Sequence, residues 1–184
     1  MENKVLKKTI LSAMLLSIGI VLPFLTLQIK EIGDSLLPMH IPVMMCGLLC
    51  GPYYGLLIGV ILPLLRSVLF SMPPLYPNAV WMAAELATYG FTIGFIHNRF
   101  TSYSLKSIYI SLVTSMISGR VIWGITKAVL LGVGGKAFTA EAFIVGGFVD
   151  ALPGIVLQLI LIPSVMSGIN HIRFSRQNKQ EVQK

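Results

Sequence analysis

The sequence predicts an all-α integral membrane protein, with six transmembrane helices in a single membrane domain, residues 1–184. The first observation behind this fold class is composition: hydrophobic residues make up 55% of the chain, charged residues only 11%, and the mean hydropathy is +0.81. A water-soluble domain carries about 25% charged residues, so this chain lacks the charge to cover a surface that faces water. The second observation is the length of the apolar runs, and the third is the uneven distribution of the basic residues.

Apolar runs cover 119 of the 184 residues, and each run gives one or two predicted helices. About 20 apolar residues cross the hydrocarbon core as an α-helix, so the 30-residue run 41–70 is too long for one span. It contains Gly51-Pro52, and glycine suits the position after a helix end while proline suits the first turn of the next helix. We therefore expect two helices there, whereas a kink in place of the break would leave five in all. The predicted helices are 9–27, 41–50, 52–70, 79–96, 108–131 and 142–169.

Basic residues set the predicted orientation, because loops on the cytoplasmic side of a membrane are enriched in Lys and Arg. With both termini in the cytoplasm, the outside loops carry only Lys30 and Lys136. The inside segments then carry nine basic residues: Lys4, Lys7, Lys8, Arg99, Lys106, Arg173, Arg176, Lys179 and Lys184. The run 9–27 has no small-residue cleavage site after it, which favours an uncleaved first span over a signal peptide. The sequence thus predicts a multi-pass protein of the cell membrane with both termini cytoplasmic.

Five ionisable residues fall inside or at the ends of the predicted spans. They are Arg66, Glu85, Arg120, Lys127 and Asp150. Each costs about 2.5–3.5 kcal/mol near the centre of a membrane helix, so we expect them to pair or to line a polar cavity in the outer half of the bundle. Arg66 and Glu85 can alternatively form an ion pair that joins two helices, and Asp150 can pair with Arg120 or Lys127. Lys127 can also extend to the outer interface.

Aromatic residues accompany these charges. Arg120, Trp123 and Lys127 follow i, i+3, i+7 spacing and share one helix face, which suits a flat or anionic small molecule. Loop 71–78 contains three prolines and is predicted to close over the pocket, although a tight crossover between helices explains it equally well. His40 is interpreted as an interfacial residue. The predicted substrate-binding residues are Arg66, Tyr76, Asn78, Glu85, Tyr89, Arg120, Trp123, Lys127 and Asp150.

Two patterns of small residues concern helix packing. Glycines recur every fourth residue from Gly47 to Gly59, which favours close approach of helices inside the bundle. On the first helix, Ala13 and Ser17 leave a notch that can receive a helix of a partner. The cysteines Cys46 and Cys50 are interpreted as small buried residues.

Several function classes find no support in the sequence. It contains no His-Glu-x-x-His pair or paired carboxylates for an intramembrane enzyme, no metal-ligand spacing and no nucleic-acid-binding motif. It also lacks a Gly-x-x-x-x-Gly-Lys-Ser/Thr motif, so we expect no ATP hydrolysis, no cofactor and no catalytic residues. A small self-sufficient secondary transporter is the main alternative to a binding subunit, but no inverted repeat is visible. An intramembrane enzyme is a weaker alternative.

The chain resembles, over essentially its whole length, the substrate-binding S component of energy-coupling factor (ECF) transporters. The resemblance lies in the size, in the basic ends, and in the stretches Gly47–Gly59, Leu64–Pro74 and Glu85–Gly90. The notch at Ala13 and Ser17 is similar to the family's Ala-x-x-x-Ala coupling motif, from which Ser17 departs.

This resemblance implies that the protein captures a water-soluble vitamin at the outer face of the membrane. It also implies association with a transmembrane T subunit and two cytoplasmic ATPase subunits, which drive toppling of the S component and release of the substrate. If Arg66 pairs with Glu85, and Asp150 pairs with one cation of helix 108–131, one cation is left for a substrate anion. Among the family's substrates this favours pantothenate over folate or niacin, while neutral rings such as pyridoxine or a hydroxymethylpyrimidine stay open.

Overall fold

The computed structural model describes residues 2–26, 35–100, 104–135 and 137–182, and these ranges contain helices and no β-strand. The all-α prediction is therefore confirmed. The helices, in chain order, are α1 (Glu2–Val21), a 3-10 helix η1 (Leu22–Thr26), α3 (His40–Cys50), α4 (Pro52–Phe70), a π-helix η2 (Leu75–Ala79), α5 (Val80–His97), α6 (Leu105–Val133), α7 (Ala140–Ile144), a π-helix η3 (Val145–Val149) and α8 (Leu152–Val182).

Five helical segments of the described chain are long and apolar enough to cross a membrane. They are Asn3–Leu25, Pro52–Phe70, Leu75–His97, Leu105–Val133 and Leu152–Asn170. The apolar helices α3 and α7 with η3 are shorter. One predicted helix is thus too short to span alone, and the bundle combines full spans with shorter helices.

The run 41–70 is divided where the sequence predicts. Gly51 separates α3 from α4 with φ +106°, a conformation that glycine adopts without the steric cost of a Cβ. Its backbone N–H donates to the Gly47 carbonyl at 3.1 Å and closes α3, and Pro52 begins α4. The two-helix interpretation of this run is confirmed.

The first and the last predicted helices differ most from the structure, whereas the bounds of the other four agree within three residues. The first begins at Glu2, and its α-helix ends at Val21; its predicted end at residue 27 lies outside the described residues, as do Lys30 and Lys136. The predicted helix 142–169 is interrupted between η3 and α8. Pro153 explains the restart at Leu152, because proline has no N–H to donate and fits the first turn of a helix.

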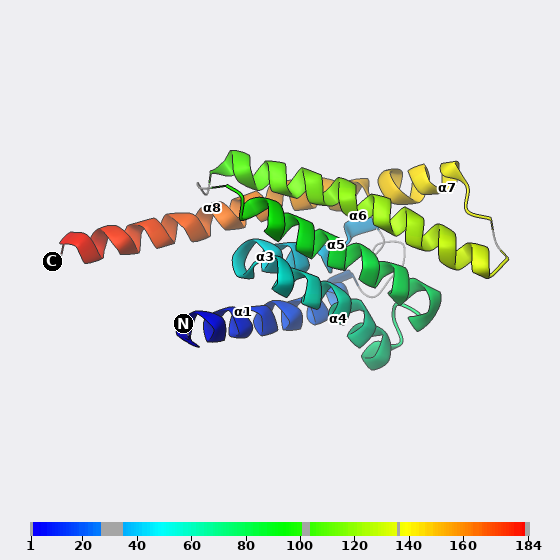
Figure 1. Cartoon of the computed structure of the whole chain (residues 1–184), viewed down its shortest axis with the longest axis horizontal. Helices are drawn as coiled ribbons and strands as arrows, with labels where there is room; N and C mark the ends of the chain where they lie inside the picture. Colours follow the sequence, from blue (N-terminus) through cyan, green and yellow to red (C-terminus); the bar gives the residue numbers. More distant parts are fainter. Residues whose placement is uncertain (1, 27–34, 101–103, 136, 183–184) are drawn as a thin grey trace.

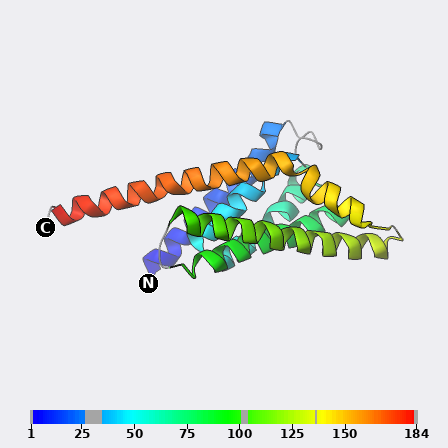
Figure 2. The same cartoon turned by 90° about the horizontal axis from the view of Figure 1, so that it is seen from above.

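Figure 1 shows how the helices are arranged. Helices α6 and α8 lie on one side of the molecule, α1 lies on the other, and α3, α4 and α5 lie between them. The start of α1 and the end of α8 lie at the same end of the molecule, whereas η2 and the connection from α6 to α7 lie at the opposite end. In Figure 2, α8 extends beyond the other helices toward the C-terminus.

Glycines allow α3, α4 and α5 to pack backbone against backbone. A Cβ on Gly90 would overlap the carbonyl of Gly55, and a Cβ on Gly59 would overlap the backbone of Leu86 and Ala87. A Cβ on Gly47 would overlap the carbonyl of Gly90. The glycine series therefore serves internal packing, as predicted.

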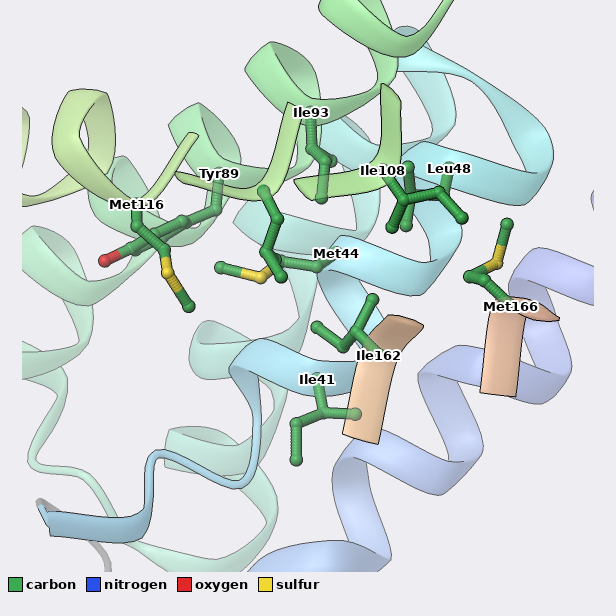
Figure 3. Close-up of a cluster of buried hydrophobic side chains, with 10 residues drawn as sticks. Ile41, Met44, Leu48, Tyr89, Ile93, Ile108, Met116, Ile162 and Met166 are labelled. Carbon is green, nitrogen blue, oxygen red and sulfur yellow. The ribbon is translucent and has the colours of Figure 1, made fainter. Parts of the chain in front are cut away.

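Two apolar clusters share α3. One joins α3 to α5, α6 and α8, and Figure 3 shows its side chains, among them Met44, Ile93, Ile108 and Ile162. The other joins α3 to α1 and α4 and includes both cysteines, which are buried and free as predicted. Because α3 contacts helices on both sides, it fixes the position of its first residue, His40, inside the bundle.

Candidate functional site

A cavity of about 200 Å³ lies between the start of α3, the start of α5, the second half of α6 and η3. Figure 1 places the start of α5 and the end of α6 at the end of the molecule opposite both termini. The residues that line the cavity are Leu37, His40, Trp81, Met82, Glu85, Arg120, Trp123, Lys127, Gly146 and Asp150. The cavity thus combines aromatic walls with both signs of charge.

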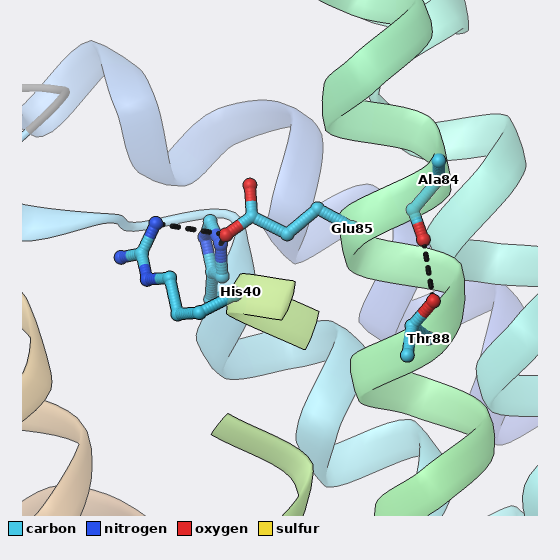
Figure 4. Close-up of polar contacts among 5 residues, drawn as sticks. His40, Ala84, Glu85 and Thr88 are labelled. Carbon is cyan, nitrogen blue, oxygen red and sulfur yellow. Dashed lines mark hydrogen bonds and ion pairs between the residues drawn. The ribbon is translucent and has the colours of Figure 1, made fainter. Parts of the chain in front are cut away.

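Glu85 is the polar centre of the cavity. Arg120 donates from Nη1 to Glu85 Oε1 at 2.9 Å, and His40 Nε2 lies 3.4 Å from the same oxygen. Glu85 and Arg120 are only 2% and 3% exposed, so their ion pair is charge-assisted and largely shielded from solvent. Figure 4 shows the Glu85 carboxylate beside His40. One turn further along α5, Thr88 donates its hydroxyl to the Ala84 carbonyl at 2.8 Å and so serves its own helix.

Arg120 retains hydrogen-bonding capacity that the described residues do not use. Its Nε and Nη2 atoms are buried without a hydrogen-bond partner in this part of the chain, and so are both ring nitrogens of His40. Buried polar atoms are nearly always hydrogen-bonded to protein or to ordered water. These donors beside the cavity therefore suit a ligand that carries acceptor atoms.

Lys127 lies within an aromatic cage, which we define as Trp81, Trp123 and Phe138. Its Nζ atom lies 4.4 Å from the centroid of Trp123, 5.3 Å from Trp81 and 5.4 Å from Phe138. All three distances are within the range of about 6 Å over which an aromatic face attracts a cation. The ammonium group is thus held at the wall of the cavity instead of extending to the interface.

Trp123 is fixed by its neighbours. Phe138 meets its ring edge-on and Phe143 lies tilted to it, both at 6.0 Å between centroids. A Cβ on Gly146 or Gly147 would lie 3.4 or 3.3 Å from the indole, so the π-helix η3 approaches the ring closely. The Arg120 guanidinium lies 5.9 Å from the ring centroid. The indole is therefore within cation–π range of both cations of α6.

The structure brings five of the predicted residues together at the cavity: Glu85, Arg120, Trp123, Lys127 and Asp150. The predicted pairing of Arg66 with Glu85 is wrong, because Glu85 pairs with Arg120. Arg66 instead donates to the Ile20 carbonyl at the end of α1 and lies away from the cavity lining. Asp150 is exposed, at the rim of the cavity.

The other predicted residues lie around the cavity and not in its lining. Tyr89 is 2% exposed, and its ring packs edge-on against His40 with 5.0 Å between the centroids. Tyr89 therefore supports His40, which lines the cavity, without lining the cavity itself. Tyr76 is 61% exposed and Asn78 is half-buried, both in the π-helix η2. Within the described chain, the loop 71–78 therefore contributes no side chain to the cavity lining.

Sequence reasoning missed His40 and Trp81. His40 is 1% exposed, which overturns its interpretation as an interfacial residue. Leu37 and Met39, just before it, are buried as well, so this segment enters the bundle before α3 begins. Trp81 precedes Glu85 by four residues, and the helical spacing that joined Arg120 to Trp123 would have placed it on the same face.

The site offers no metal-binding set among the residues that the structure describes: no three His, Cys, Asp or Glu side chains approach closely enough. Away from the cavity, Ala13 and Ser17 are both exposed on α1. Ser17 donates its hydroxyl to the Ala13 carbonyl at 3.0 Å, so the notch presents mainly apolar atoms.

A comparison with protein families matches residues 7–166 to the family described as ECF transporter, substrate-specific component. The chain belongs to this family. Comparisons with curated proteins and with solved structures found no match. The match runs from the first turns of α1 into α8 and so covers every element that lines the cavity.

Membership confirms the resemblance and sets the general role of the chain. It is the substrate-specific subunit of an ECF importer and a multi-pass membrane protein. ECF substrate-specific components are transporter subunits and not enzymes, and they bind small molecules and work with a T subunit and ATPases.

Proposed function

We propose that this S component captures a small water-soluble vitamin with a carboxylate group in the cavity beside Glu85 and Arg120. The observation that carries the proposal is the state of Arg120, which is 3% exposed and has two nitrogen atoms without a hydrogen-bond partner among the described residues. A desolvated guanidinium binds carboxylates well, because two of its N–H groups can meet two oxygens. Lys127 adds positive charge to the same cavity.

The spare positive charge comes from a different residue pair than the sequence suggests. Arg66 does not pair with Glu85, because Glu85 pairs with Arg120. The proposal now depends on the geometry of Arg120, which can hold Glu85 through Nη1 and a substrate through Nη2 and Nε. Pantothenate remains a candidate on this basis.

The volume of the cavity limits the size of the substrate. Ligand cavities typically measure about 300–1,000 Å³, and this one measures about 200 Å³. A compact vitamin such as niacin or pantothenate suits it better than folate does. Niacin has a second feature in its favour, because its ring can stack on Trp81 or Trp123, which both line the cavity.

Neutral rings form a second candidate class, supported by the same two tryptophans. A pyridoxine or hydroxymethylpyrimidine ring could stack on an indole while its polar groups hydrogen-bond to Glu85 and to the nitrogen atoms of Arg120 and His40. The two classes differ in one property, the charge that the substrate presents to Arg120.

Calorimetry on the purified S component without nucleotide tests the proposal through matched ligand pairs. Niacin is compared with nicotinamide, and pantothenate with its alcohol, panthenol. We expect the carboxylate of one pair to bind at least tenfold more tightly than its neutral partner, a difference of about 1.4 kcal/mol. Tight binding of neutral rings alone, or of cations alone, would overturn the carboxylate proposal.

We further propose that the cavity faces the outside, that both termini lie in the cytoplasm, and that the protein resides in the cell membrane. Support comes from the nine basic residues on the inside in this orientation and from the position of the cavity opposite both termini. The exposed notch at Ala13 and Ser17 would then contact the T subunit of an assembly that also includes two ATPase subunits.

Ala13→Trp tests this docking surface. An indole on this exposed face should hold the helices of the two subunits apart, so uptake into cells should be lost while vitamin binding to the solitary S component is unchanged. Val5→Trp, another exposed position on α1, is the matched control and should preserve uptake. Normal uptake by Ala13→Trp would exclude docking through this notch.

A further inference from the structure

We infer that Lys127 is a specificity-determining residue: its ammonium group occupies the aromatic cage of Trp81, Trp123 and Phe138 and thereby excludes organic cations from the cavity. The inference rests on the proposed function, since it assumes that the cavity is the substrate site. It explains why the substrate site would reject organic cations.

The cage has the geometry of a binding site for an organic cation. Three rings from three segments, the first turn of α5, the last third of α6 and the chain just before α7, surround one Nζ atom at 4.4–5.4 Å. Aromatic cages of this kind recognise quaternary ammonium groups in ligands. Here the cation is part of the protein.

The indole of Trp123 has contacts besides the one with Lys127. It is 7% exposed and packs against Phe138, Phe143 and the glycines of η3. Phe143 is itself packed edge-on against Phe148 at 5.8 Å. Removal of the lysine side chain should therefore leave this indole in place beside an open space.

The covalent attachment of Lys127 to α6 explains why a ligand cation cannot compete. A tethered group acts at a high effective concentration, so a ligand would have to expel the ammonium before it could use the rings. The expelled ammonium would remain close to Arg120, which lies 5.9 Å from the same indole. A cationic ligand would then lie beside the expelled ammonium group, and like charges at close range repel each other.

The tryptophans of the protein provide a fluorescence probe of the cage. It has two tryptophans, and both of them, Trp81 and Trp123, belong to the cage. Intrinsic tryptophan fluorescence therefore reports only on this site. Tetramethylammonium, which has no hydrogen-bond donor and fits an aromatic cage, is the ligand for the titration.

The decisive variant is Lys127→Ala in the full chain. We expect tetramethylammonium to change its fluorescence at a concentration at least tenfold lower than any change in the wild type. Lys127→Arg keeps a cation in the cage and should show no gain. Lys106→Ala, at an exposed position near the other end of α6, is the matched control and should behave as the wild type.

A third variant identifies the rings as the cause. Adding Trp81→Ala to Lys127→Ala should remove most of the gain, with the remaining fluorescence from Trp123. Melting temperature and size-exclusion profile establish that each variant is folded. If folded Lys127→Ala binds tetramethylammonium no more tightly than the wild type, the inference is wrong.

The vitamin titration of the wild type separates this inference from the proposed function. If the wild type binds no vitamin but Lys127→Ala gains the cation, the cage is real and the carboxylate proposal fails. If the wild type binds a carboxylate vitamin and Lys127→Ala gains no cation, only the present inference fails.

Discussion

Arg66 and Arg120 are the two arginines buried in membrane-spanning segments of the described chain, and they are buried to nearly the same extent, 2% and 3% exposed. The residue type and the burial are alike, yet the surroundings differ. Among the described residues, Arg66 contacts a backbone carbonyl and two phenylalanine rings, whereas Arg120 contacts a carboxylate and an indole and lines a cavity.

The contacts of Arg66 connect the end of α1 to the end of α4. Its guanidinium donates to the Ile20 carbonyl, next to the point where α1 gives way to the 3-10 helix η1. Phe24 and Phe70 lie 5.3 and 5.4 Å from it and meet each other edge-on. A backbone carbonyl near a helix end and two aromatic faces are suitable neighbours for a buried cation.

Arg120 differs in what its surroundings leave unused. Glu85 takes one nitrogen, and the other two lie beside the cavity without a hydrogen-bond partner in the described chain. Arg66 also has one nitrogen atom, Nε, that is buried without a hydrogen-bond partner in the described chain, but Arg66 does not line the cavity. The burial of a charge therefore does not show whether a ligand is one of its partners, whereas a cavity beside its unused donors indicates that a ligand can be.

The largest effect should follow from Arg120→Met. It leaves the Glu85 carboxylate buried beside His40 without its cationic partner, which typically costs about 3–5 kcal/mol. We expect a lower melting temperature and loss of vitamin binding by at least tenfold. The double variant with Glu85→Gln should recover stability without recovering binding. Retained affinity in Arg120→Met would place the substrate elsewhere.

Arg66→Met should have a smaller effect, of a different kind. It removes one charged hydrogen bond, worth about 1.5–3 kcal/mol, so the melting temperature should fall while the affinity for the vitamin stays within about twofold of wild type. Scanning fluorimetry and calorimetry on one preparation measure both quantities. A loss of affinity as large as that of Arg120→Met would remove the distinction drawn between the two arginines.

Asp150→Asn should have the smallest effect. Asp150 is exposed at the rim of the cavity, and charges in such positions contribute about 0–1 kcal/mol. Because its carboxylate repels an anionic substrate, we expect the variant to bind a carboxylated vitamin up to about fivefold more tightly, and less so at high salt. Weaker binding in this variant would indicate that Asp150 accepts a hydrogen bond from the substrate.

Local signals in the sequence were sufficient for most of the fold and part of the site. The break at Gly51-Pro52 is a property of those two residues, and the structure has it there. Glu85, Arg120, Trp123 and Lys127 were placed together by their depth and by helical spacing, and all four line the cavity.

The predictions for Arg66 and His40 are wrong because they depend on which segments lie next to each other in the bundle. Arg66 follows Leu62 by one turn, and Leu62 packs on Gly19 of α1, so this face of α4 turns toward α1. Nothing in the sequence states that α1, and not α5, lies there. His40 was misplaced because its burial depends on the path of the chain before α3, where Leu37 adopts φ +51°.

The glycine contacts between α4 and α5 have a further consequence, for conformational entropy. Helices that interlock through long side chains must immobilise rotamers, at a cost of up to about 2 kcal/mol for each flexible side chain. Gly55, Gly59 and Gly90 have no rotamers to lose where they meet the opposite backbone. Gly59 lies against the backbone of Leu86, the residue after Glu85. This contact sets the position of the Glu85 Cα atom, from which the central carboxylate of the cavity extends. We therefore expect little movement of the α5 backbone at Glu85.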